Sequence, residues 1–375
     1  MMKPIFPQSL WLLVLVCTAL VAACGARAAT PVAPPTAIPQ PAATVVATPP
    51  ASATIEPGAT ATVVERVTAT ATPVPPAPLL LVARESTLWA MLPDGAAQAF
   101  VTAEGGLVAS PAIAPDGRHV AYVANYRRDG SIAIYSQLML VDRSGGEPRL
   151  LWQPGQGVIG RLAWAADGSA IYAGIDGLRT AGAALGGARL QEIMRIDVAS
   201  GEAGPVFEDA LDPAMAPDGR SIAYLRAADS ATDERAPIAA LELAPLDGSA
   251  GQVLVDGAQF EGMAAPRFSP DGRSIVFAAA GGPAAGLLPS LLALLGPATA
   301  HAHGDITYDL WQVGIDGSQL RRIAVLAEDD PVAVYGPDGS LLVLAAGGFY
   351  GIDPATGTAE RLAGEGSHGG IDAWP

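Results

Sequence analysis

One short phrase recurs five times in this chain, and it constrains the fold more than any other feature. In each copy a large apolar residue precedes a turn that reads Pro-Asp-Gly (Ala-Asp-Gly once), and an alternating apolar run follows. Pro presets φ, Asp bonds its own backbone and Gly accepts a positive φ, which is the chemistry of a tight hairpin turn. The turn aspartates lie 51, 51, 53 and 67 residues apart, at Asp116, Asp167, Asp218, Asp271 and Asp338. A repeat of this length predicts a propeller or a solenoid.

A second hairpin phrase follows the first in every unit. Each copy is an apolar alternating run that ends in a turn rich in Asp and Gly, at Leu138–Gly146, Ile193–Gly201, Leu241–Gly248, Leu310–Gly317 and Phe349–Gly357. Runs of this kind read as strands. Two hairpins per unit give four strands, which make one propeller blade.

The two ends of the repeat region predict how the ring closes. An unmatched phrase, Leu88–Gly95, stands before the first full repeat and is preceded by the strand-like Leu79–Arg84. At the other end, Gly370–Pro375 begins a further repeat and stops. We therefore expect an all-β, six-bladed propeller of four-stranded blades, closed by pairing of the N- and C-terminal strands, which leaves no open sheet edge at the centre.

The repeated phrase resembles the TolB-like (WD40-like) propeller repeat, and the resemblance covers residues 79–375. It implies the fold strongly and the function weakly. Propellers of this kind serve as binding scaffolds, as lids of peptidases and, rarely, as enzymes.

The first residues predict export and lipid attachment. Residues 1–23 carry one positive charge and an apolar core that is too short for a membrane span, so we interpret them as a signal peptide. Their end, Leu20-Val-Ala-Ala-Cys24, resembles the bacterial lipobox, which implies acylation of Cys24. The alternative is an ordinary signal peptide whose cleavage site happens to include a Cys.

The next segment, residues 24–78, is composed mainly of Ala, Thr, Pro and Val. It offers too little apolar area to offset the entropy of ordering, so we expect a disordered linker between the lipid-anchored Cys24 and the propeller. The other cysteine, Cys17, lies inside the signal segment, so the mature chain is predicted to contain no disulfide.

The charge balance argues against nucleic acid as a partner. The net charge is −16, and the basic residues form no stripe that could follow a phosphate backbone. We expect the acidity to keep a monomeric surface domain soluble.

The connections between the second and third strands of the blades are the most elaborate, at residues 125–131, 176–191, 226–236 and 280–307. Insertions on one face of a rigid ring are a usual place for binding. The longest contains an apolar stretch, Leu287–Gly296, which either folds back over the mouth of the channel or contacts a partner or the lipid surface. The predicted binding face comprises Tyr126, Arg127, Leu288, Leu291, Leu292 and Leu294.

The same insertion ends in a weak metal-binding pattern formed by His301, His303 and Asp305. In an extended segment these three side chains point to one side, and zinc or copper would accept them if a further ligand came from elsewhere. The alternative is a pair of exposed loop histidines. We expect no cofactor.

Nothing in the sequence predicts nucleophilic catalysis. It contains no Gly-x-Ser-x-Gly elbow, and no α/β domain follows the propeller. We therefore expect a non-enzymatic binding or scaffold lipoprotein, extracytoplasmic and anchored in the bacterial cell envelope. Its partner would be an envelope protein or an amphipathic ligand. The alternative function is a metal-dependent polysaccharide lyase or hydrolase of propeller fold.

Overall fold

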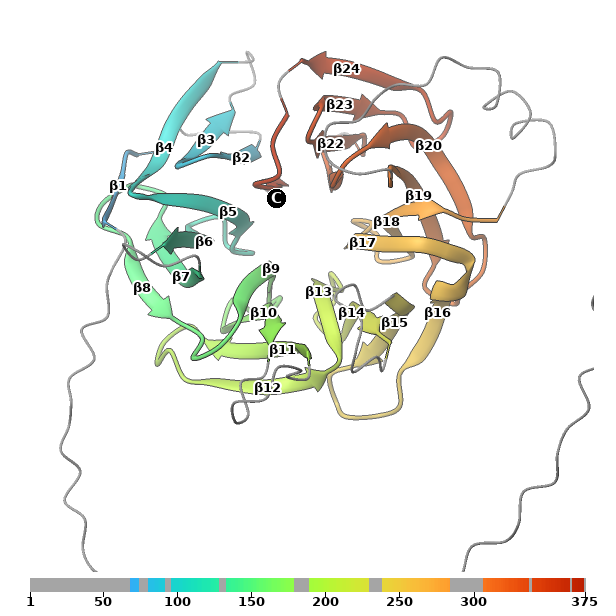
Figure 1. Cartoon of the computed structure of the whole chain (residues 1–375), viewed down its shortest axis with the longest axis horizontal. Helices are drawn as coiled ribbons and strands as arrows, with labels where there is room; N and C mark the ends of the chain where they lie inside the picture. Colours follow the sequence, from blue (N-terminus) through green and yellow to red (C-terminus); the bar gives the residue numbers. More distant parts are fainter. Residues whose placement is uncertain are drawn as a thin grey trace, which may run out of the picture. The chain divides into compact units, whose positions relative to one another are not determined.

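A computed structural model describes residues 68–73, 80–91, 96–127, 133–178, 189–228, 238–283, 306–336, 339–364 and 366–373. These residues belong to one compact unit, Val64–Pro375. They form six antiparallel sheets arranged as blades around a central opening, and the C-terminus lies at the centre (Figure 1). The predicted all-β, six-bladed propeller is confirmed.

Blade 1 is assembled from three separate parts of the chain. From the centre outward its strands are β25 (Ile371–Ala373), β2 (Leu80–Arg84), β3 (Thr87–Met91), β4 (Ala97–Glu104) and β1 (Thr68–Ala71).

The other five blades are each contiguous in sequence, and their first strand is the innermost. Blade 2 comprises β5 (Gly106–Ile113), β6 (His119–Arg127), β7 (Ile134–Asp142) and β8 (Arg149–Trp152). Blade 3 comprises β9 (Val158–Trp164), β10 (Ala170–Leu178), β11 (Arg189–Asp197) and β12 (Ala203–Glu208). Blade 4 comprises β13 (Ala210–Met215), β14 (Ser221–Ala227), β15 (Ile238–Pro245) and β16 (Gln252–Asp256), which a short 3-10 helix, Gly257–Gln259, follows. Blade 5 comprises β17 (Phe260–Phe268), β18 (Ser274–Gly281), β19 (Tyr308–Gly314) and β20 (Arg321–Glu328). Blade 6 comprises β21 (Val332–Tyr335), β22 (Leu341–Ala345), β23 (Gly348–Ile352) and β24 (Ala359–Ala363).

The C-terminal strand closes the ring, as the sequence predicts. β25 pairs with β2 in antiparallel register, with Leu80 opposite Ala373 and Val82 opposite Ile371. Ile371 is buried between the first and last blades in a cluster with Leu80 and Leu344. The inner edge of β2 is therefore covered by the other end of the chain.

The predicted linker is wrong at its C-terminal end, because Thr68–Ala71 form a strand. β1 pairs with β4, and Ala69 and Ala71 pack against the core between blades 1 and 2. The composition argument considered only what the segment could bury by itself. An existing sheet edge supplies backbone partners, so a strand of small residues can be ordered there with little apolar area of its own. Residues 1–67 and 74–79 lie outside the described residues.

The repeated turns have the predicted geometry. The carboxylates of Asp116, Asp167, Asp218 and Asp271 each accept a hydrogen bond from the backbone N–H two residues later, at 2.8–3.0 Å. The following glycine has φ between +67° and +72° in each case, a conformation that favours Gly. Asp338 lies outside the described residues.

The core lies between the blades rather than at the centre of the ring. In the described part of the chain, the buried residues form six clusters, each mainly between two neighbouring blades. Trp164 of blade 3 illustrates the contact: its ring is buried, and its Nε1 donates to the carbonyl oxygen of Ala112 in blade 2 at 2.9 Å. Each sheet thus buries both faces against its neighbours.

All four elaborated connections begin later than the sequence predicts, because β6, β10, β14 and β18 extend to Arg127, Leu178, Ala227 and Gly281. Asn125–Arg127 continue β6, whose last pair is Arg127 with Ile134, and β10 and β11 pair as far as Leu178 with Arg189. Tyr126 stacks on Tyr135 of the next strand, with ring centroids 5.6 Å apart, which favours this longer hairpin. No helix in the described residues is long and apolar enough to cross a membrane.

Candidate functional site

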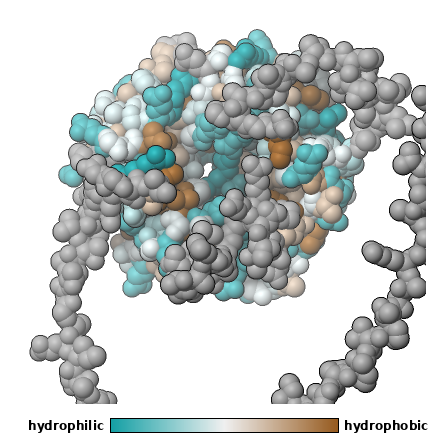
Figure 2. All heavy atoms as spheres, in the orientation of Figure 1, coloured by the Kyte–Doolittle hydropathy of each residue, from teal (hydrophilic) through white to brown (hydrophobic). Residues whose placement is uncertain are grey.

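The central channel contains a cavity of about 320 Å³ that is lined by the innermost strands of all six blades. The space-filling view shows the opening, with hydrophilic side chains along its wall (Figure 2). The charged residues in this wall come from parts of the chain that are far apart in sequence.

A backbone irregularity recurs on the inner strands around this channel. Ser110, Asp212 and Ala265 each lie six residues before a turn aspartate and have φ of +48°, +50° and +52°. Each precedes a proline and lies at a bulge where the inner strand shifts register against its neighbour. Bulges of this kind re-aim side chains, and a non-glycine residue in this conformation costs of order 1 kcal/mol.

Arg161 occupies the same position of the repeat in blade 3 and holds two carboxylates. Its Nε lies 3.3 Å from Oδ2 of Asp212 in blade 4, and its Nη2 lies 2.9 Å from Oδ1 of Asp330 beside blade 6. Asp330 also lies 3.8 Å from Nδ1 of His368. Burial raises the pKa of Asp330, although the charge of Arg161 opposes that shift. Arg161 therefore ties three blades together across the channel.

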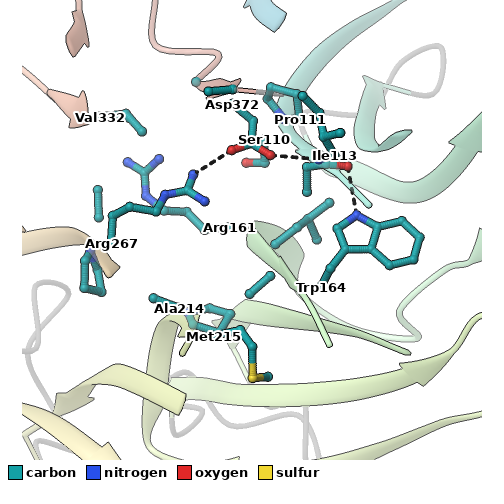
Figure 3. A pocket seen from close by; sticks show the side chains of 18 of the residues that line it. Ser110, Pro111, Ile113, Arg161, Trp164, Ala214, Met215, Arg267, Val332 and Asp372 are labelled. Atoms are coloured by element: carbon teal, nitrogen blue, oxygen red, sulfur yellow. Dashed lines mark hydrogen bonds and ion pairs between the residues drawn. The ribbon is translucent and has the colours of Figure 1, made fainter. Parts of the chain in front are cut away.

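Asp372 fastens the C-terminal strand in the same way (Figure 3). One carboxylate oxygen lies 3.3 Å from Nη2 of Arg267 in blade 5, and the other accepts a hydrogen bond from the backbone N–H of Ile113 in blade 2 at 2.7 Å. Burial raises the pKa of Asp372, against the lowering effects of Arg267 and of the backbone hydrogen bonds. The last strand is thus bound to two other blades through one side chain.

These contacts indicate that the channel charges brace the ring. The carboxylates of Asp212, Asp330 and Asp372 each face an arginine, so the cations and anions satisfy one another. Among the described residues, no group of three or more His, Cys, Asp or Glu side chains is arranged to hold a metal ion. His301, His303 and Asp305 lie outside the described residues.

A second hollow lies on the face where the second and third strands connect, between blades 1 and 2 and the start of blade 3. Its volume is about 810 Å³, and its lining includes Leu107, Tyr126, Arg127, Ile134 and Val158. Leu107 and Ile134, which line this hollow, are 58% and 47% exposed. We call this hollow the loop-face cleft.

Two of the six residues of the predicted binding face lie in the described part of the chain. Tyr126 and Arg127 both line the loop-face cleft, but Tyr126 is only 5% exposed and belongs to the core, while Arg127 is exposed. The Tyr126 hydroxyl is buried and has no hydrogen-bond partner among the described residues. Cys24, Leu288, Leu291, Leu292 and Leu294 lie outside the described residues.

Sequence reasoning missed the charged channel residues. Three of the inner strands place a proline directly after the bulge residue, whereas blade 3 has Arg161 followed by Leu162. That departure from the repeat was a usable signal for Arg161. Asp330 and Asp372 carry no such signal, because they do not occupy this position of the repeat.

Comparison with known proteins locates the fold. No protein-family model and no curated protein matches the sequence. TolB from Acinetobacter baumannii is similar at 15% identity and a TM-score of 0.52, over 79% of this chain and 66% of that chain. A chain of the nidogen/laminin complex is similar at 11% identity and a TM-score of 0.55, over 78% of this chain and 97% of that one. An oligogalacturonate lyase in complex with manganese is similar at 16% identity and a TM-score of 0.46, over 74% and 70% of the two chains.

At these identities the likeness defines the architecture and leaves the activity open. The chain has the fold of a TolB-like six-bladed propeller, as the repeated phrase implies. It spans just under two thirds of the length of the TolB chain.

Proposed function

We propose that this chain is a non-enzymatic binding scaffold, held at the bacterial cell envelope by an acyl group on Cys24, and that it binds a partner protein at the loop-face cleft. The observation that carries the proposal is the exposure of Leu107 and Ile134 beside a hollow of about 810 Å³. Apolar side chains that line a hollow on a rigid scaffold are typical of a protein-binding surface.

The composition of the cleft supports a protein rather than a free sugar. Leu107, Ile134 and Val158 offer apolar contact, and Arg127 places a guanidinium at the rim. A partner that inserts one apolar side chain between Leu107 and Ile134 and presents an acidic group to Arg127 would match this arrangement. The blade sheets beneath are buried on both sides, so the surface is preorganised.

The cleft can be tested with a matched pair of variants. Leu107→Asp with Ile134→Asp places two charges in the cleft, whereas Val253→Asp with Val325→Asp places two charges on similarly exposed valines of blades 4 and 5, which are 58% and 64% exposed. We expect the first pair to reduce recovery of specific partners from solubilised membranes by at least about tenfold, and the second pair to leave recovery unchanged. Equal recovery with both pairs would show that the cleft is not the binding surface.

Membrane attachment is tested separately by Cys24→Ser. We expect the variant to move from the membrane fraction to the soluble fraction, or to accumulate as an uncleaved precursor, because the acceptor of the acyl group is lost. A variant that stays in the membrane fraction as firmly as the parent would contradict lipid anchoring and would leave the cleft proposal untouched.

A further inference from the structure

The junction between blades 6 and 1, where β25 closes the ring (Figure 1), is buried only near the channel. Its buried residues in the described part of the chain belong to β2, β17, β21, β22 and β25, all of them first or second strands of their blades. The other five clusters each include buried residues of third or fourth strands, such as Phe100, Leu151 and Ile323. Among the described residues, the outer halves of blades 6 and 1 therefore leave apolar surface unburied between them.

This outer part of the junction is a hollow of about 530 Å³, which we call the seam slot. Its described lining residues are Val82, Arg84, Trp89, Met91 and Ala97 of blade 1, and Leu344, Phe349, Ala363 and Gly364 of blade 6. Arg84 is the one charged residue in this described lining. A volume of this size with a mainly apolar lining is typical of small-molecule sites.

The blade 1 wall shows that the slot is elongated. Ala97 lies opposite Met91, and Met91 lies opposite Leu80, so Ala97 stands two strands outward from Leu80. Arg84 lies four residues further along β2 than Leu80 and on the same face of the sheet. At the usual strand spacings, Arg84 and Ala97 are therefore about 17 Å apart, at diagonally opposite corners of the wall.

The two corners differ in polarity. Arg84 is half-buried where β2 turns into β3, whereas Ala97 is exposed. A guanidinium binds a carboxylate through two parallel hydrogen bonds. Along the rest of the described lining, a polar ligand would lose its hydrogen bonds to water without replacement, so this part favours hydrocarbon. A molecule with a carboxylate at one end of a single unbranched hydrocarbon chain matches both the shape and the charge.

We propose that the seam slot binds a long-chain fatty acid, with its carboxylate at Arg84 and its methyl end toward Ala97. The slot shares no described lining residue with the loop-face cleft. The proposal is therefore independent of the partner proposed for that cleft and of the lipid anchor.

A series of fatty acids of increasing chain length tests the shape. Trp89 lines the slot, so a brominated fatty acid should quench its fluorescence, and Trp89→Phe identifies the part of the signal that comes from Trp89. The full chain would carry Cys24→Ser, so that the proposed acyl group cannot compete. Unlabelled fatty acids then displace the brominated probe.

We expect the affinity to rise by about fourfold for each added methylene until the chain reaches Ala97, and then to level off. Quenching that does not saturate, or an affinity that rises without a plateau, would overturn the proposal, because either result describes nonspecific partitioning onto apolar surface.

A matched pair of variants locates the site. Ala97 and Ala203 are both exposed alanines, in β4 and in the outer strand β12, and Ala203 does not line the slot. A phenyl group at position 97 displaces about two methylenes of the chain, so Ala97→Phe should weaken binding of the longest fatty acids by at least about tenfold. Ala203→Phe should leave it unchanged. Equal affinities for these two variants would show that the fatty acid binds elsewhere.

The carboxylate is tested by comparing a fatty acid with the fatty alcohol of the same length. We expect Arg84→Met to weaken binding of the acid by about tenfold and to leave the alcohol unchanged. In the unsubstituted slot, the acid should bind about tenfold more tightly than the alcohol. Equal affinities there would overturn the role of Arg84, and that comparison holds even if Arg84→Met folds poorly.

Discussion

Aspartates occupy two contrasting regions of this propeller, the hairpin turns and the central channel. In the turns, Asp271 is exposed and accepts hydrogen bonds from the hydroxyl of Ser269 and the backbone N–H of Arg273, which lower its pKa. In the channel, Asp372 is 13% exposed, and burial raises its pKa even though it pairs with Arg267. The pKa of the aspartate is thus lowered in the turn and raised in the channel.

The turn aspartates and the channel aspartates therefore stabilise the fold over different ranges. A turn aspartate bonds atoms two residues away, so its stabilising effect is local and does not depend on the rest of the ring. A channel aspartate joins blades that are distant in sequence, and its charge must be compensated after removal from water. We therefore expect damage in the channel to spread to the whole ring, and damage in the turns to remain local.

The most severe test removes the strand that carries Asp372. Deleting Ile371–Pro375 should lower the free energy of unfolding by about 5 kcal/mol or more, because it removes buried Ile371, the Asp372 contacts and the cover of the β2 edge. Urea denaturation would measure the change. Deleting only residues 374–375 is the control, and equal midpoints for the two truncations would contradict closure through β25.

Removing a cation from the channel should destabilise the fold more than removing a cation near the turns. Arg161→Met leaves Asp212 and Asp330 without their shared partner, and we expect a loss of about 3 kcal/mol in the free energy of unfolding. The control is Arg195→Met. Arg195 is exposed, and its charge makes only a minor contribution to the lowered pKa values of the turn aspartates Asp167 and Asp197. If both substitutions cost the same, the Arg161 contacts do not brace the ring.

Replacing single carboxylates by amides gives a smaller contrast. Asp372→Asn keeps an acceptor for the N–H of Ile113 and removes a carboxylate whose charged form is costly to bury, so we expect the free energy of unfolding at pH 7 to rise by about 1 kcal/mol. Asp271→Asn should leave the melting temperature within about 1 °C of the parent, since Asn forms the same turn. Calorimetry on both variants decides the comparison, and a larger effect at Asp271 would reverse it.

The pH dependence of stability should differ in sign between the two aspartates. The folded pKa of Asp372 is raised above 3.8, so its favourable contribution is present below about pH 3.8 and declines as the pH rises toward the folded pKa. The folded pKa of Asp271 is lowered, so its contribution is present above about pH 3.8 and is lost as the pH falls toward the folded pKa.

Urea denaturation of the parent and of the two Asn variants between pH 3 and pH 7 would separate these contributions. The difference between the parent and Asp372→Asn should vary mainly above pH 3.8, and the difference for Asp271→Asn should vary mainly below it. A difference for Asp372→Asn that is flat above pH 3.8 would show that its carboxyl is not held in a desolvated site.

The loop-face cleft could be predicted from the sequence only in part. Tyr126 and Arg127 could be chosen because they close an elaborated hairpin, and they do line the cleft. Leu107 and Val158 could not be chosen, because they belong to other strands and reach the cleft only through the packing of neighbouring blades.

The sequence by itself determined the repeat, the turns and the closure of the ring. These features depend on short-range chemistry: Asp and Gly at fixed offsets, an alternation of two, and an incomplete repeat at each end. The tertiary structure alone decided the fifth strand on blade 1 and the partners of Arg161 and Asp372. Those contacts join residues as far apart as Ile113 and Asp372, and local patterns carry no information about which charges a closed ring will bring within 4 Å of one another.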